Sequence, residues 1–281
     1  MESYVFLAVL AAAAFHAGWN AILKLRLEPL LAMSLIAAAS GLVAVPLLPF
    51  VDTPHPDSWI FLFASLVIHF VYYIALAEAY RTGDLGQVYP IARGTAPLLT
   101  AIGASLWLGE YLGLVGWTGI SVLAAGIVLL SLRGTRDAHA FDRRAVGFAL
   151  LTAVSIAAYT LADGIGARLA GGALPYIVWL FVLDGLMMLC FGLMRFPRAM
   201  VTEASRSWVM VVCGGALSCA AYAIAIWAMT KAPIALVAAL RETSVLFAAI
   251  IGVAFLREPL IMIRGLAALL VAAGMMLVRL R

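Results

Sequence analysis

Long apolar runs separated by short polar breaks dominate this sequence and limit it to one class of fold. Each run is close to the roughly 20 residues that a helix needs to cross a bilayer. Backbone groups in lipid must be bonded within their own segment, and runs such as 266–277 lack the alternation of a membrane strand. We therefore expect an all-α integral membrane protein with ten transmembrane helices. Their predicted ranges are 3–23, 30–50, 59–80, 86–108, 111–132, 145–167, 174–194, 207–229, 233–256 and 260–280.

The composition excludes a sizeable soluble domain. Hydrophobic residues make up 65% of the chain and charged residues 11%, whereas soluble domains carry about 25% charged residues. The net charge of +4 is assigned to loops rather than to a nucleic-acid partner. Cys190, Cys213 and Cys219 all lie in apolar runs without the spacing of a metal site, so no metal and no cofactor are expected.

The two halves of the chain repeat one another. At a constant separation of 148 residues, Arg93 aligns with Arg241 and Glu110 with Glu258. At the same separation, the sequence AAG at 124–126 aligns with AAG at 272–274. Five predicted helices per half is an odd number, so the second half enters the membrane from the opposite side. This pattern is typical of secondary transporters with inverted repeats. The predicted divisions are a first repeat at 1–133, a basic linker loop at 134–144, and an inverted second repeat at 145–281.

Charged residues inside the predicted helices indicate a polar cavity. Arg93 and Arg241 lie well inside their helices, where an arginine costs about 2.5–3.5 kcal/mol on insertion scales unless its surroundings are polar. His16, Asn20 and Lys24 recur at every fourth position and so share one helix face. The structural alternative is that each arginine is locked to a carboxylate, and that Lys24 extends to the membrane surface.

Backbone-breaking residues precede Arg93 in the run QVYPIARGTAP. Pro90 removes one helical hydrogen bond, which predicts either a discontinuous transporter helix or a simple packing kink. Small residues on the fifth and tenth helices predict that these two helices pack closely. The predicted contact faces contain Ser121 and Ala125 on one helix and Ala268 and Ala272 on the other.

Acidic residues within the helices are candidates for carrying a coupling proton. The main candidates are Glu78, Asp184 and Glu242, and Asp163, His16 and His69 are further ones. Aromatic residues within the helices could line the same cavity, although packing is the default role of a tyrosine there. They are Trp19, Tyr72, Tyr73, Tyr89, Tyr159, Trp179 and Tyr222.

Several motifs resemble the ten-helix, EamA-like branch of the drug/metabolite transporter superfamily. They are HAGWNAILK in the first helix, YPIARGTAPLL and LGE around the fourth, and ALRETSVLFAAI with LREP around the ninth. The resemblance implies a central cavity formed by both halves, small metabolites as substrates and transport by alternating access. It also gives a hint of a phosphonate-like substrate. It places at the cavity His16, Asn20, Tyr89, Arg93, Tyr159, Tyr222, Arg241 and Glu242.

The leading hypothesis is a secondary-active transporter in the cell membrane for a small polar metabolite. Two guanidinium groups suit an anionic or zwitterionic solute, with Glu242 near an amine. One alternative is a drug or cation exporter of the same fold. A membrane-embedded enzyme is a further alternative, but the chain lacks GxSxG and HExxH motifs. A non-transporting subunit is the last. We expect a monomer or homodimer.

The predicted orientation differs between two lines of argument. With ten helices, the side of the termini carries only Arg168, Lys231, Arg279 and Arg281, while the other loops hold the remaining basic residues outside the helices. The positive-inside rule then predicts termini outside the cytoplasm, whereas the family resemblance implies termini inside.

Overall fold

The computed structural model is a bundle of helices, and it describes residues 1–23, 27–83, 85–131, 142–256 and 262–280. No strand occurs within these ranges. The first part of the chain forms α1 (Ser3–Leu23), α2 (Pro29–Ala44), η1 (Val45–Phe50), η2 (Pro56–Ser58), α3 (Trp59–Thr82), α4 (Leu85–Trp107) and α5 (Gly113–Ser131). The second part forms α6 (Arg143–Leu169), α7 (Ala173–Arg195), α8 (Pro197–Arg206), α9 (Trp208–Met229), α10 (Ile234–Arg241), α11 (Ser244–Leu256) and α12 (Met262–Leu280).

Half of the α-helices in the described part of the chain are long and apolar enough to cross a membrane. Within the described residues, six helices are long and apolar enough to cross a membrane: α1, α2 with η1, α3 with η2, α6, α7 and α9. The apolar stretches Gly113–Leu129 in α5 and Gly265–Leu280 in α12 are shorter. Large apolar side chains such as Phe50, Ile60 and Leu114 are exposed on the outside, which is the arrangement expected where the solvent is lipid.

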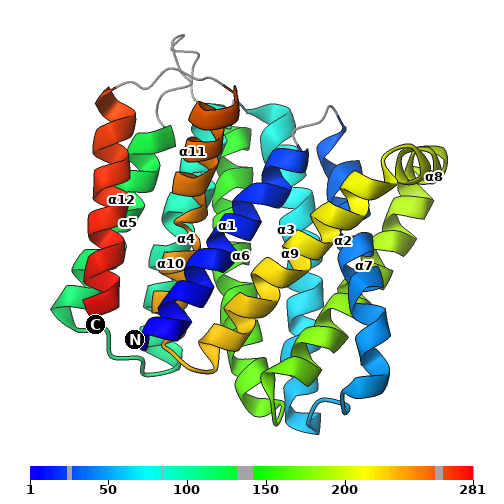
Figure 1. The fold of residues 1–281 in the computed structure, drawn as a ribbon, viewed down its shortest axis with the longest axis horizontal. Helices are drawn as coiled ribbons and strands as arrows, with labels where there is room; N and C mark the ends of the chain where they lie inside the picture. Colours follow the sequence, from blue (N-terminus) through cyan, green and yellow to red (C-terminus); the bar gives the residue numbers. More distant parts are fainter. Residues whose placement is uncertain (24–26, 84, 132–141, 257–261, 281) are drawn as a thin grey trace.

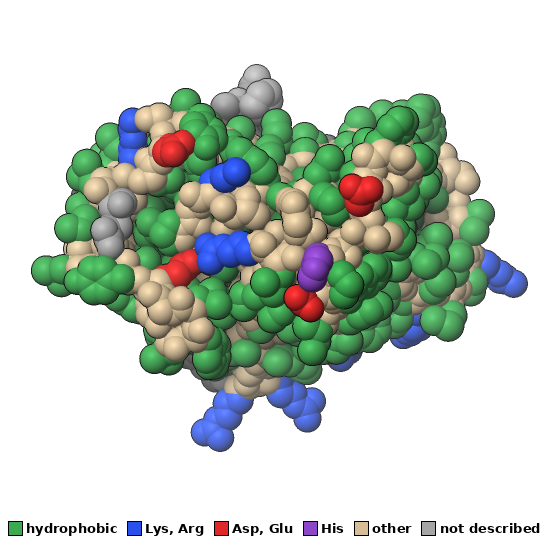
Figure 2. All heavy atoms as spheres, turned by 90° about the horizontal axis from the view of Figure 1, so that it is seen from below, with side chains coloured by type: hydrophobic (Ala, Val, Ile, Leu, Met, Phe, Trp, Pro, Cys, Tyr) green, Lys and Arg blue, Asp and Glu red, His purple; other side chains and the backbone are tan. Residues whose placement is uncertain are grey.

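Helices from the first part of the chain pack directly on helices from the second part (Figure 1). The main pairs are α3 with α6, α2 with α7, α1 with α9, and α5 with α12. The beginning of α1 and the end of α12 lie at the same end of the bundle. Seen from that end, scattered charged side chains and backbone lie in the middle, and hydrophobic side chains surround them (Figure 2).

The short helix α8 was not predicted, and it runs across the end of the bundle opposite the termini (Figure 1). Met200 is buried against Leu31 and Leu35 of α2, while Arg198 and Arg206 are exposed. This amphipathic pattern explains how ten residues form a helix that caps the bundle instead of crossing it.

The helix break occurs in the second half of the chain, not in the first. Of the two alternatives for Pro90, the discontinuous helix is wrong, because α4 continues as one helix from Leu85 to Trp107. Instead, the predicted helix 233–256 is divided into α10 and α11. At the break, the amide of Thr243 donates to the carbonyl of Leu240 at 3.0 Å, and its hydroxyl donates to the same carbonyl at 2.7 Å. A side chain that competes for a backbone carbonyl favours such a local change of course.

The helices α5 and α12 pack closely, but the faces in contact lie beside the predicted ones. A Cβ on Gly274 would lie 2.6 Å from the backbone nitrogen of Leu123, and one on Gly126 would lie 2.8 Å from that of Val271. Ser121 and Ala125, by contrast, are exposed. Glycine at the contact allows the two backbones to approach, and the predicted face was wrong because it followed alanine and serine.

Candidate functional site

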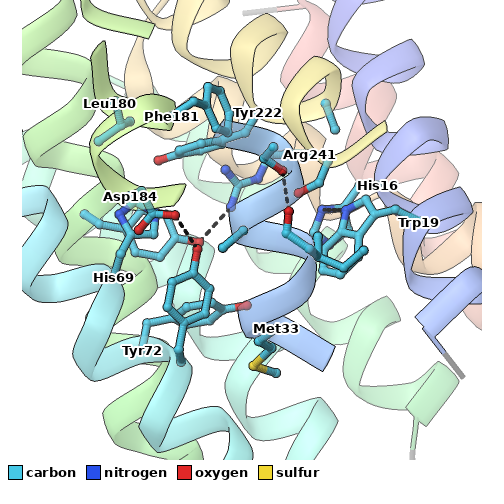
Figure 3. A pocket seen from close by; sticks show the side chains of 17 residues that line it. His16, Trp19, Met33, His69, Tyr72, Leu180, Phe181, Asp184, Tyr222 and Arg241 are labelled. Atoms are coloured by element: carbon cyan, nitrogen blue, oxygen red, sulfur yellow. Dashed lines mark hydrogen bonds between the residues drawn. The ribbon is translucent and has the colours of Figure 1, made fainter. Parts of the chain in front are cut away.

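A small cavity lies in the middle of the bundle and encloses about 100 Å³ (Figure 3). Its walls come from α1, α2 and α3 and from α6, α7, α9 and α10, so both parts of the chain contribute. Its polar lining residues are His16, Trp19, Ser40, His69, Tyr72, Tyr73, Tyr159, Asp184, Ser218, Tyr222 and Arg241.

Arg241 is the arginine that faces this cavity. It ends α10, immediately before the helix break, and its side chain lies among the cavity residues in Figure 3. The guanidinium lies 4.9 Å from the centre of the Tyr222 ring. Nη2 donates to the hydroxyl of Tyr159 at 3.3 Å, and Nε has no hydrogen-bond partner among the described residues. An arginine remains charged at any physiological pH, so it gives the cavity wall a permanent positive charge.

Arg93 has a different environment, although it aligns with Arg241 in sequence. Its Nε lies 2.8 Å from Oε2 of Glu242, and both side chains are buried. Nη2 donates to the hydroxyl of Ser244 at 3.2 Å and lies 3.3 Å from Nε2 of His16. Arg93 and Glu242 are not among the residues that line the cavity. This pair links α4 to the break between α10 and α11.

Aromatic rings form much of the wall around Arg241. The ring of His69 stacks on that of Tyr159, with 4.1 Å between their centres and 20° between their planes. Tyr222 meets Tyr159 edge-to-face at 5.8 Å, and Tyr72 meets Tyr159 edge-to-face at 5.6 Å. Such geometries are favourable for aromatic pairs, and they restrict the hydroxyl of Tyr159 that Arg241 contacts.

Two buried aspartates lie beside these rings. Asp163 accepts hydrogen bonds from the hydroxyls of Tyr176, at 3.0 Å, and Tyr222. Asp184 lines the cavity, and its Oδ2 accepts from the hydroxyl of Tyr73 at 2.9 Å. Oδ1 of Asp184 is buried and has no hydrogen-bond partner among the described residues.

The other predicted site residues have separate surroundings. His16 lines the cavity, whereas Asn20 is exposed and donates to the carbonyl of His16 at 2.8 Å. Glu78 forms an ion pair with Arg81, at 2.7 Å, whose side chain is largely exposed. The side chain of Tyr89 and residue Lys24 lie outside the described part of the chain.

Several cavity residues were not among the predicted site residues. His69, Tyr72 and Tyr73 all line the cavity from α3, where the two tyrosines lie about one helical turn after the histidine. Their spacing of three and four residues places them on one face, and this was the signal available in the sequence. Asp163 was a candidate only as an acid within an apolar helix, and the sequence does not show its partners Tyr176 and Tyr222, because they lie on other helices.

A second polar cluster joins the two parts of the chain near the end with the termini. The carboxylate of Glu110 accepts from the amides of Ile234, at 2.9 Å, and Ala235, at 3.3 Å, at the beginning of α10. Nη2 of Arg168 donates to the same carboxylate at 3.0 Å. A carboxylate at a helix N-terminus satisfies free amides and complements the helix dipole. Glu110 thereby fixes the beginning of the helix that carries Arg241.

Comparisons with known proteins show the family and the fold of this chain. The EamA-like transporter family matches residues 3–132 and 143–280. A curated relative, the "Uncharacterized transporter in cobO 3'region" of Sinorhizobium sp, is 33% identical over 75 residues, which are 27% of this chain and 52% of that protein. The matched region thus spans about half the length of that relative. A solved structure titled "Crystal structure of protein" superposes with a TM-score of 0.76 at 17% identity, covering 99% of this chain and 96% of the other. This last likeness shows the fold alone.

Proposed function

Because the chain belongs to the EamA-like transporter family, whose members are multi-pass proteins of the cell membrane, we propose that it is a secondary-active transporter. Its solute is a small anionic or zwitterionic metabolite, amino-acid-like or phosphonate-like, and it crosses the membrane by alternating access. One observation carries the choice of solute: Arg241 is buried at the cavity wall, and its Nε has no partner among the described residues.

The chemistry of guanidinium supports an acidic group on the solute. A guanidinium donates two parallel hydrogen bonds to a carboxylate or phosphonate, and its planar shape is suited to such groups. Tyr159 and Tyr222 orient the guanidinium of Arg241. Arg93 has no such role in the proposal, because the carboxylate of Glu242 contacts its guanidinium directly, whereas none of the ion pairs among the described residues includes Arg241. The solute anion therefore binds to one arginine and not between two.

We further propose ten membrane crossings in two inverted repeats. The family matches at 3–132 and 143–280 correspond closely to the two predicted repeats, with residues 134–144 between them. In this scheme α10 and α11 together make the ninth crossing, and α4 is their counterpart. Arg93 and Arg241 are then equivalent positions with different partners. The solute site lies between the repeats, as in other carriers of this design.

The small volume of the cavity supports a small solute and indicates that the helices around it are closed together in this conformation. About 100 Å³ is less than the roughly 300 Å³ at which ligand pockets usually begin. A molecule of the size of glycine fits this volume, and a larger one requires the helices to separate. Separation of helices from the two repeats is the movement that alternating access needs.

A cation exporter of the same fold is the second candidate, and Asp184 is the observation in its favour. An acid at a cavity wall that also contains aromatic rings can attract a cation. Arg241 argues against it, because an arginine keeps its charge whereas an aspartate can be neutralised by a proton.

Uptake by purified protein in liposomes tests the proposal. The probes are radiolabelled glycine, alanine, acetate and 2-aminoethylphosphonate, with tetraphenylphosphonium as the cation. We expect uptake of an acidic or zwitterionic probe that falls about tenfold to a hundredfold in Arg241→Gln, which loses a charge-assisted hydrogen-bond donor. Arg198→Gln on α8 is the matched control and retains uptake. Equal uptake in Arg241→Gln and the wild type, or uptake of the cation alone, would contradict the proposal.

A further inference from the structure

In the described part of the chain, the buried charges do not balance. Among the described side chains, two arginines and three acids are buried: Arg93, Arg241, Asp163, Asp184 and Glu242. Arg93 and Glu242 neutralise one another, which leaves Arg241 with two aspartates. An uncompensated charge is costly in the interior of a membrane protein. One negative charge therefore requires a proton or a cation.

Asp163 is suited to remain ionised. Each of its carboxylate oxygens accepts a hydrogen bond from a tyrosine hydroxyl, one from Tyr176 and one from Tyr222. Hydrogen bonds donated to a carboxylate favour the charged form. Tyr222 contacts both charged groups: its hydroxyl donates to Asp163, and its ring packs against the guanidinium of Arg241. Asp163 does not line the cavity, so solutes and water in the cavity do not reach it directly.

Asp184 is the acid that has room for a proton. Tyr73 donates to its Oδ2, but its Oδ1 is buried without a donor. The ion pairs of the described residues do not include Asp184. A proton on Oδ1 removes the excess charge and turns that oxygen into a hydrogen-bond donor beside the cavity. Unlike Asp163, Asp184 lines the cavity and can exchange a proton with it.

Among the described groups around Asp184, Arg241 is the one that carries a permanent positive charge, and it is already included in this balance. α2, which packs directly on α7, presents Gly41 to Gly185 at this level. His16 and Tyr72 lie on further walls of the cavity (Figure 3). The remaining titratable and charged groups nearby are His69 and Tyr73 on α3, Tyr159 and Asp163 on α6, Tyr222 on α9 and Arg241 on α10.

We propose that Oδ1 of Asp184 is the binding site of a coupling proton, which enters and leaves through the cavity. This inference rests on the proposed carrier function. With Asp184 protonated, the charges of Arg241 and Asp163 balance, and an anion on Arg241 adds one negative charge. Loss of the proton adds a second negative charge to the same desolvated cavity and weakens anion binding. The solute anion and the proton therefore move together.

The sign of the pH dependence follows from this coupling. A higher pH removes the proton from Asp184 and lowers the affinity for an acidic solute. Asp184→Asn carries no titrating carboxyl and imitates the protonated state. In this variant, the affinity no longer falls with rising pH, and a pH gradient no longer drives accumulation of the solute.

Infrared difference spectroscopy of the purified protein tests the proton site without any solute. We expect a protonated-carboxyl C=O band that disappears as the pH is raised, is absent from Asp184→Asn and returns at a shifted frequency in Asp184→Glu. In Asp163→Asn, which removes the other buried negative charge, Asp184 becomes the counter-charge of Arg241, and the band disappears at a lower pH than in the wild type. In Tyr73→Phe, which keeps Asp184 but removes the donor to its ionised form, the midpoint shifts to higher pH. Thermal melting of each variant identifies any that fails to fold, and Tyr73→Phe provides an independent readout with Asp184 intact.

Two results would overturn this inference. One is a titrating carboxyl band that persists unchanged in folded Asp184→Asn, and the other is the absence of such a band in the wild type across the pH range in which it stays folded. Either result leaves the uptake experiment on Arg241 unaffected. Conversely, a band assigned to Asp184 in a protein that transports none of the probes supports the proton site and counts against the proposed solutes.

Discussion

Nε of Arg93 and Oε2 of Glu242 lie 2.8 Å apart in a buried ion pair that links α4 to the break between α10 and α11. The residue before Glu242 in the chain is Arg241, which faces the cavity. Adjacent residues at the end of a helix point in different directions. The break thus directs one residue to a structural partner and the other toward the solute.

Removing one member of this pair is expected to destabilise the protein. Glu242→Gln leaves the charge of Arg93 without its buried counter-charge, which costs about 3–5 kcal/mol in comparable pairs. The free energy of unfolding, measured by denaturation in mixed micelles, checks this expectation. The double variant Arg93→Gln/Glu242→Gln removes both charges and should recover most of the loss. Wild-type stability of the single variant would mean that the pair is solvated and not buried.

The hydrogen bonds of Glu110 are expected to stabilise the fold and to hold in place the helix α10 that carries Arg241. In Glu110→Gln the side chain loses its charge-assisted hydrogen bonds with Arg168 and with the amides that begin α10. Hydrogen bonds to charged groups contribute about 1.5–3 kcal/mol each, so the melting temperature should fall clearly. Glu203→Gln on α8 is the matched control, because it lies at the other end of the bundle. A melting temperature equal to that of the control would contradict the stabilising role of the Glu110 hydrogen bonds.

The contact between α2 and α7 requires glycine beside the proposed proton site. A Cβ on Gly185 would lie 2.6 Å from Cα of Gly41, so in Gly185→Ala the two helices must separate. Overpacking of this kind costs about 1–3 kcal/mol. In Gly147→Ala on α6, nothing lies within 4 Å of the added Cβ, and stability should be unchanged or higher by up to about 1 kcal/mol. Equal stability of the two variants would show that the contact is loose.

The sequence predicts the positions of most helices because apolar length is a strong constraint in lipid. The predicted helix 3–23 coincides with α1, and 174–194 with α7 to within one residue at each end. The break after Arg241 could not be predicted in the same way. No glycine or proline marks it, and it depends on the hydroxyl of Thr243 and on the pairing of Glu242 with Arg93 from a distant helix.

The site was predictable in its residue types and less so in its partners. Arg241, His16, Tyr159 and Tyr222 line the central cavity, and their role in binding the solute stays a prediction. Glu242 was expected to bind an amine of the solute, but in the structure its carboxylate is paired with Arg93. Sequence spacing describes neighbours along one helix, whereas which acid meets which arginine depends on how separate helices pack.

A structure of the protein with the best-transported acidic probe bound tests the central claim most directly. We expect the probe to occupy the central cavity with its carboxylate or phosphonate oxygens within hydrogen-bond distance of the Arg241 guanidinium, while Arg93 remains paired with Glu242. A probe bound outside this cavity, or one whose acidic group contacts Arg93 in place of Arg241, would contradict the account.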